Sequence, residues 1–133
     1  MIEAFFLLAV LGQDAPVPEI VRPARPMIEC SEHINDDRAL RRCLEDLLSS
    51  AEAQLDGALD AARNEAAEID LDMPGLAEAT AHLDAAHSAW ITYRDAECQR
   101  RASLLMIGDD SEMVALDCRI ALTRARTTEL REQ

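Results

Sequence analysis

Apolar side chains recur every three or four positions along three stretches of this chain, at about 37–69, 73–101 and 110–131. That spacing places them on one face of an α-helix, whereas a half-buried strand would alternate apolar and polar positions. Few residues interrupt the pattern, because four of the five prolines lie between Pro16 and Pro26 and only four glycines occur. Alanine and leucine dominate, in place of the β-branched and aromatic runs typical of strands. The sequence therefore predicts an all-α fold.

Capping residues and helix breakers place the ends of three helices. The run from Asn35 to Asp37 consists of helix-capping residue types and opens the first helix. Asp72 can cap the second, with Pro74 tolerated in its first turn, and Gly108 separates the second from the third. A chain of this length holds one modest core, so three helices joined by short turns predict a three-helix antiparallel bundle.

Trp90 and Tyr93 are the only aromatic residues beyond the first dozen positions. They lie three residues apart, on one face of the second helix, and we expect both in the core. Each belongs to an apolar seam with a heptad-like repeat. The seam consists of Leu76, Ala79, Leu83, Ala86, Trp90 and Tyr93.

The first 27 residues differ in composition from the rest. Residues 1–12 contain the apolar run Ala4 to Leu11, too short to span a bilayer but typical of a signal peptide. Glu3 and the lack of a basic residue before this run are atypical, and an upstream start or a weak signal would account for them. Residues 13–27 form a proline-rich linker, so the folded domain is predicted at 28–133.

The four cysteines, Cys30, Cys43, Cys98 and Cys118, are expected to form two disulfides in an exported protein. Zinc is the alternative, but structural zinc ligands come in close pairs and these cysteines do not. Cys98 and Cys118 each lie about ten residues from Gly108, so an antiparallel hairpin brings them level. Cys30 would then bind Cys43, although a folded-back N-terminal segment could also reach another helix.

The chain is strongly acidic, with 26 Asp and Glu, 13 Arg, no Lys and a formal charge of -13. Nucleic acid and anionic membrane surfaces need a cationic face, so both are excluded as expected partners, and no integral membrane span is expected. The charge fits a basic protein partner. It also fits a small secreted domain that is kept soluble by its charge.

No pattern of catalytic or cofactor-binding residues is present. The sequence lacks a glycine-rich phosphate loop and an H-E-x-x-H motif, and its acidic residues fall on predicted solvent-facing helix surfaces. His82 and His87 are five apart and diverge around a helix, and His33 is isolated, so no metal site is expected. We read His82 and His87 as surface residues and expect neither an enzyme nor a cofactor.

The last forty or so residues carry a distinctive pattern, W-x-x-Y-R-D-x-x-C followed by C-x-x-x-x-T-x-x-R-x-x-x-L. Its residues here are Trp90, Tyr93, Arg94, Asp95, Cys98, Cys118, Thr123, Arg126 and Leu130. With the two upstream cysteines, this resembles the LprI-like lysozyme-inhibitor domain family over about residues 28–131. The resemblance implies a small exported bacterial helical domain, periplasmic or secreted, that is stabilised by disulfides. Unlike the lipoprotein that gives the family its name, this chain has no lipobox cysteine after its apolar run.

The signature residues are expected to be structural. Adjacent residues on a helix point apart, so Arg94 and Asp95 are each expected to bond a separate partner, with Glu97 and Arg126 as candidates. A candidate partner contact lies at the tip between the second and third helices, and the same residues could instead cap the end of the bundle. The candidate contact residues are Leu104, Leu105, Ile107, Asp109 and Asp110.

Two functions remain open at this point. The first is a binding module that inhibits a lysozyme, or muramidase, by surface contact, since animal lysozymes are basic and an acidic inhibitor would meet them faster. The second is a structural or adaptor protein of the bacterial envelope without lysozyme activity. The oligomeric state is left open.

Overall fold

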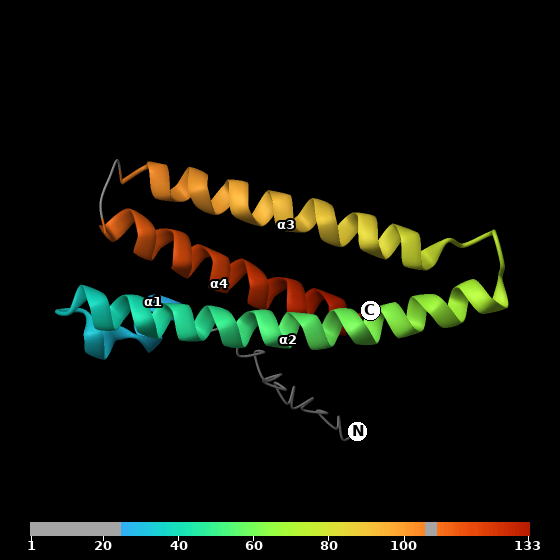
Figure 1. Ribbon diagram of the computed structural model, residues 1–133, viewed down its shortest axis with the longest axis horizontal. Helices are drawn as coiled ribbons and strands as arrows, with labels where there is room; N and C mark the ends of the chain where they lie inside the picture. Colours follow the sequence, from blue (N-terminus) through green and yellow to red (C-terminus); the bar gives the residue numbers. More distant parts are fainter. Residues whose placement is uncertain (1–24, 106–108) are drawn as a thin grey trace, which may run out of the picture.

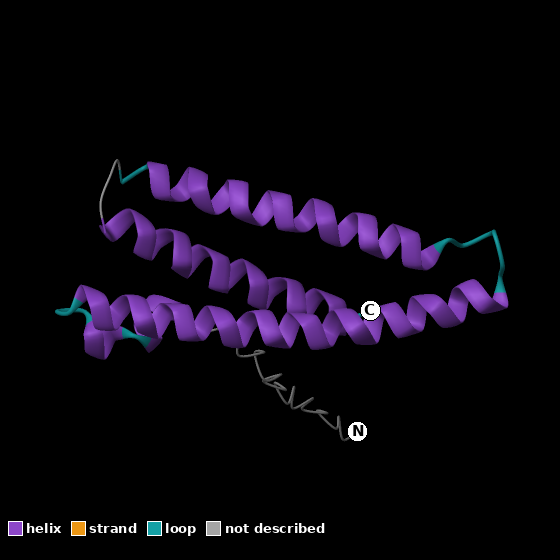
Figure 2. Cartoon of the chain, viewed as in Figure 1, coloured by secondary structure: helices purple, strands orange, loops and turns teal. Residues whose placement is uncertain are grey.

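The protein is a bundle of three long helices with a short helical segment at its N-terminal side (Figures 1 and 2). The structure is a computed structural model that describes residues 25–105 and 109–133. Within these ranges the chain forms no strand, and the predicted all-α antiparallel bundle is confirmed. The elements are α1 (Pro26–Glu29), the 3-10 helix η1 (Ser31–His33), α2 (Asp37–Asp72), α3 (Ala79–Ser103) and α4 (Asp109–Arg131).

The start of α2 follows the predicted cap. The Asp36 side chain accepts hydrogen bonds from the backbone N–H groups of Arg38 and Ala39, both at 3.1 Å. These bonds satisfy N–H groups that have no partner within the helix. From this start one face of α2 is buried, at Leu40, Leu44, Ala51, Leu55, Ala58, Leu59 and Ala66. Ile69, which the three-and-four spacing also places on this face, is 37% exposed.

The prediction that the next helix begins at Met73 is wrong, because α3 begins at Ala79. Residues 73–78 form a turn instead, in which Gly75 has φ 72° and Glu78 has φ 49°. Glycine reaches this left-handed region without steric cost, whereas Glu78 holds a conformation that is uncommon for its type. A residue with positive φ cannot continue a right-handed α-helix. The helix therefore cannot begin at Asp72 and Pro74, as the sequence predicts, and begins only after Glu78.

Asp70, and not Asp72, caps α3. Its Oδ1 accepts the backbone N–H of Ala79 at 2.7 Å and its Oδ2 accepts that of Thr80 at 3.0 Å. Hydrogen bonds from Thr80 and then Ala79 hold the pKa of the Asp70 carboxyl below its usual value. The last turn of α2 thus supplies the carboxylate that fixes the start of α3.

The core consists of two clusters along the bundle. One lies near the start of α2 and contains Cys30, Leu40, Leu44, Ala51, Met113 and Ile120. The other contains Leu55, Ala58, Leu59 and Leu130, with Leu83 and Trp90 packed against it from α3. One face of α4 is buried at Met113, Ile120, Thr123, Thr127 and Leu130, and Leu116 on the same face is partly buried.

The expected seam of α3 is only partly correct. Leu83 and Trp90 pack inward, but Leu76 is 82% exposed in the turn and Tyr93 is 56% exposed on the helix. Only Cys98 and Ala102 of α3 are fully buried. The reason is that α2 and α4 cover only a narrow strip of α3. A continuous heptad seam needs a wider buried face than this strip.

The predicted disulfides Cys30–Cys43 and Cys98–Cys118 are confirmed, with Cα–Cα distances of 5.9 and 5.5 Å. The first ties the N-terminal segment to α2 and the second ties α3 to α4. The N-terminal segment also contacts α4, where the Met27 backbone N–H donates to Asp117 at 2.9 Å. Both disulfides lie in the half of the bundle that holds the start of α2, which we call the disulfide end.

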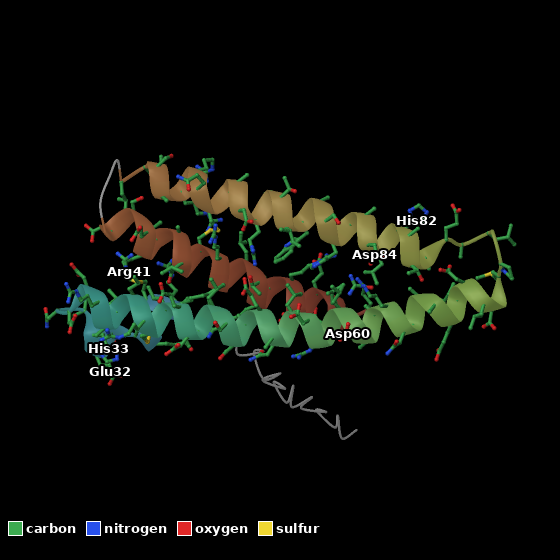
Figure 3. All side chains as sticks on the ribbon, viewed as in Figure 1. Glu32, His33, Arg41, Asp60, His82 and Asp84 are labelled. Carbon is green, nitrogen blue, oxygen red and sulfur yellow. A yellow bond between two sulfur atoms is a disulfide. The ribbon has the colours of Figure 1, made fainter. Side chains whose placement is uncertain are left out.

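At the opposite end, α2 and α3 continue past the end of α4 and meet in the turn described above (Figure 1). We call residues 69–78 the distal turn. Asp60, His82 and Asp84 lie toward this end, whereas Glu32, His33 and Arg41 lie at the disulfide end (Figure 3). Across the helix ranges described, none is apolar enough over a sufficient length to cross a membrane.

Candidate functional site

Arg94 is the centre of a polar cluster that joins the three long helices. Its side chain is 11% exposed, and its guanidinium donates to Glu52 of α2 at 3.3 Å and to Thr123 of α4 at 3.2 Å. Its Nε donates to Asp95 at 3.0 Å. Asp95 also pairs with Arg119 of α4 at 3.6 Å. The signature residues Arg94, Asp95 and Thr123 therefore form one network between helices.

The expected partners of Arg94 and Asp95 are wrong. The two side chains bond each other, because the arginine side chain is long enough for its Nε to reach the carboxylate of the next residue. Glu97 pairs instead with Arg100 and Arg101 on its own helix, at 2.8 Å each. These hydrogen bonds lower the pKa of Glu97 to about 2.

Trp90 lies between two side chains along α3. The Arg94 guanidinium carbon is 5.4 Å from its ring centroid, within the range of a cation–π contact. The His87 ring stacks on it at 6.0 Å between centroids, with 16° between the planes. Trp90 is half-buried against the second core cluster. Of the two aromatic residues of the signature, Trp90 therefore packs against the core, whereas Tyr93 is exposed to solvent.

His87 differs from the expected surface residue, whereas His82 is exposed as predicted. His87 is half-buried, and its Nδ1 has no hydrogen-bond partner among the described residues. Burial, followed by the positive charges of Arg63 and Arg126, lowers the pKa of His87. The spacing of three to Trp90 was the available sequence clue. No group of metal-ligating side chains occurs in the part of the chain that the structure covers.

The remaining signature residues lie on α4 beside this cluster. Arg126 is bonded to Glu129 of its own helix at 2.6 Å, and Leu130 is buried in the second core cluster. Cys98 and Cys118 form the second disulfide. The signature residues therefore connect helices or fill the interior, except for Tyr93, which is exposed, and Arg126, which pairs within α4.

The predicted contact residues at the tip between α3 and α4 are only partly described. Leu104 is 71% exposed and Leu105 is 47% exposed, so neither is buried as a cap of the bundle. Asp110 is exposed in the first turn of α4. Ile107 and the Asp109 side chain lie outside the described part of the chain.

A second exposed apolar surface, which the sequence reasoning missed, lies at the distal turn. Four apolar side chains are exposed there. They are Ile69 (37%), Leu71 (79%), Met73 (46%) and Leu76 (82%). The available clue was that Leu71 and Met73 follow the last position of the buried stripe of α2, beside Pro74 and Gly75. A leucine outside the three-and-four spacing has no interior position to occupy.

Comparison with known proteins identifies what this bundle is similar to. A family model described as lysozyme inhibitor LprI matches residues 30–130, which span both disulfides and the three long helices. An uncharacterised protein of Rhizobium meliloti (strain 1021) is 30% identical over 115 residues, covering 81% of this chain and 80% of the relative. No solved structure matches the chain.

Proposed function

Because the chain belongs to the LprI lysozyme-inhibitor family, we propose that it is an exported binding module that inhibits a lysozyme by surface contact. The observation that carries this proposal is the extent of the family match, residues 30–130, which includes nearly all of the described bundle. The two disulfides support a place outside the cytoplasm, in the periplasm or the medium, because they persist in oxidising compartments.

The charge of the protein supports a basic enzyme as the partner. A formal charge of -13 attracts a cationic protein over distances of about the Debye length, roughly 8 Å at physiological salt. Such attraction speeds association more than it strengthens the final complex. We therefore expect inhibition to weaken as salt is added.

Inhibition by contact requires no reaction centre in the inhibitor. The Arg94 side chain bonds Glu52 of α2 and Thr123 of α4, so this polar cluster supports the fold. The exposed apolar residues at the two ends of the bundle supply area that a partner could bury. The tip residues Leu104, Leu105 and Asp110, with Ile107 and Asp109, remain one candidate contact surface.

The test is a turbidity assay in which a basic animal lysozyme clears a suspension of bacterial cell walls. Purified oxidised protein should slow clearing at low salt and slow it less at moderate salt. An unrelated protein of similar negative charge is the control, because any polyanion binds a basic enzyme to some extent. Clearing that stays unchanged at a large molar excess would remove the proposal.

A second candidate function is a structural or adaptor protein of the bacterial envelope. It is favoured by one observation, namely that exposed apolar residues occur at both ends of an elongated bundle, at Leu104 and Leu105 and at the distal turn. One molecule could then contact two partners. Co-purification with other periplasmic proteins, together with no binding to lysozyme, would support this function over inhibition.

A further inference from the structure

The apolar residues of the distal turn lie at the extreme end of the bundle. Leu71 and Leu76 are 79% and 82% exposed, more than Leu104 and Leu105 at the other end. Since α4 ends before this point, no third helix among residues 25–105 and 109–133 covers the turn (Figure 1). Exposed apolar side chains grouped in this way mark contact surfaces more often than scattered ones do.

Carboxylates dominate the charge around the distal turn. The stretch 64–93 contains six carboxylates and no Arg or Lys. The disulfide end is mixed, because α2 begins with Arg38, Arg41 and Arg42 and α3 ends with Arg100 and Arg101. A basic partner therefore meets several arginines at the disulfide end, whereas the nearest arginine in sequence to the distal turn, Arg63, is already paired with Asp84, so attraction dominates there.

A shallow hollow of about 530 Å³ lies between the distal turn and the first turns of α3, lined in part by Asp70, Gly75 and Glu78. Its walls include three carboxylates, those of Asp70, Glu78 and Asp84. Asp84 is paired with Arg63 at 3.0 Å, and Asp70 is bonded to the start of α3. All three carboxylates line the hollow, so its surface is acidic and open to a lysine or arginine side chain of a partner.

Polar contacts between α2 and α3 give this surface a defined shape in the folded protein. Asp70 joins the last turn of α2 to the first turn of α3 through two backbone hydrogen bonds, and the Arg63–Asp84 ion pair joins the same helices nearby. A surface held in place loses less conformational entropy when it binds. The distal turn therefore combines exposed apolar area, an excess of negative charge and a defined shape.

We propose that the distal turn is the surface that contacts lysozyme, with Leu71 and Leu76 buried against the enzyme and a cationic side chain of the enzyme over the hollow. This inference rests on the proposed function and names its contact surface. A second copy of this chain is a poorer occupant, because self-association would bring two sets of carboxylates together. The tip at Leu104 and Leu105 is the competing surface.

The test compares two double variants by their dissociation constants for a basic animal lysozyme. Leu71→Ser with Leu76→Ser changes the distal turn, and Leu104→Ser with Leu105→Ser is the matched control at the tip. All four side chains are exposed, so circular dichroism should show that both variants fold. We expect the distal variant to bind about tenfold more weakly or worse, as for central contact residues, and the tip variant to bind like the parent protein.

Charge variants test the electrostatic part. Glu68→Gln with Asp72→Asn removes two exposed carboxylates near the distal turn, and Glu45→Gln with Asp46→Asn removes two exposed ones near the start of the same helix. The net charge changes equally in both. The association rate at low salt should fall further for the distal pair, because the effect of a charge decreases with its distance from the contact.

The outcomes separate this inference from the function on which it rests. Binding by the parent protein that is unaffected by the distal variants, or lost in the tip variant alone, overturns the inference and leaves the proposed function in place. No binding by the parent protein overturns both. A dimer of the parent protein, measured by light scattering and dissolved by the distal variants, shows that the turn joins two copies and also overturns the inference.

Discussion

Replacing Arg94 with methionine should destabilise the protein without removing its ability to bind. The bond to buried Thr123 is worth about 1 kcal/mol of unfolding free energy. The cation–π contact with Trp90 adds roughly 0.5–1 kcal/mol. Glu52 and Asp95 are 47% and 43% exposed, so water replaces their lost partner and the two ion pairs add less than about 1 kcal/mol together. We expect a total loss of about 2 kcal/mol.

Arg126 provides the matched control. Its side chain is 12% exposed, almost the same as that of Arg94, but its ion pair is with Glu129 on its own helix. A pair with this spacing contributes roughly 0.2–0.5 kcal/mol, so Arg126→Met should cost much less. Arg94→Lys should fall between the two, because lysine keeps the charge and lacks the planar fork that reaches several partners at once.

Urea unfolding followed by far-ultraviolet circular dichroism at pH 7 measures these differences. An Arg94→Met variant as stable as Arg126→Met would refute the reasoning that Arg94 holds three helices together. Lysozyme binding should persist in Arg94→Met under conditions where it is folded. Loss of binding by the folded variant would instead assign Arg94 to the contact with the partner.

Three further predictions concern other parts of the bundle. Replacing Cys98 and Cys118 together by Ala should lower the unfolding free energy by about 3 kcal/mol, as the chain-entropy model gives for a separation of 20 residues, and thermal unfolding of the oxidised proteins would measure it. The folded pKa of Glu97 is about 2, below its usual 4.5, so its contribution to stability is present above pH 4.5 and is lost as the pH falls toward 2. Glu97→Gln should therefore be less stable than the parent protein at neutral pH and should approach it in acid. Asp70→Ala should speed amide hydrogen exchange in the first turn of α3, which loses its acceptors, while exchange at the disulfide end is unchanged.

The sequence pattern predicts α2 and α4 well, because each is covered by neighbours over a broad face and buries a regular stripe. It predicts α3 less well. Tyr93 is exposed because α2 and α4 cover only part of the surface of α3. The spacing of apolar residues within α3 does not show how much of that surface is covered. The disulfide pairing could be inferred because two cysteines at equal distances from a turn must lie level in a hairpin.

Long-range polar contacts account for the other differences. The cap of α3 comes from Asp70, nine residues before the N–H group that it accepts, so the usual rule for a cap directly before the helix selects Asp72 instead. Likewise, the bond between Arg94 and Asp95 depends on how the arginine side chain bends toward α2 and α4. The exposed distal turn could have been inferred only from leucines placed beside a Pro-Gly pair.

Because both disulfides lie at one end, the two halves of the bundle should differ in their resistance to local unfolding. Covalent cross-links restrain the start of α2 and the hairpin of α3 with α4, whereas the far ends of α2 and α3 are joined by the distal turn and by polar contacts such as Arg63–Asp84. Thermal opening of the oxidised protein should therefore begin where the two helices extend alone and stop at the cross-linked half. A ligand seated on the opening half would suppress these local fluctuations first, so its arrival would be visible in amide exchange at the distal end before any change in global unfolding.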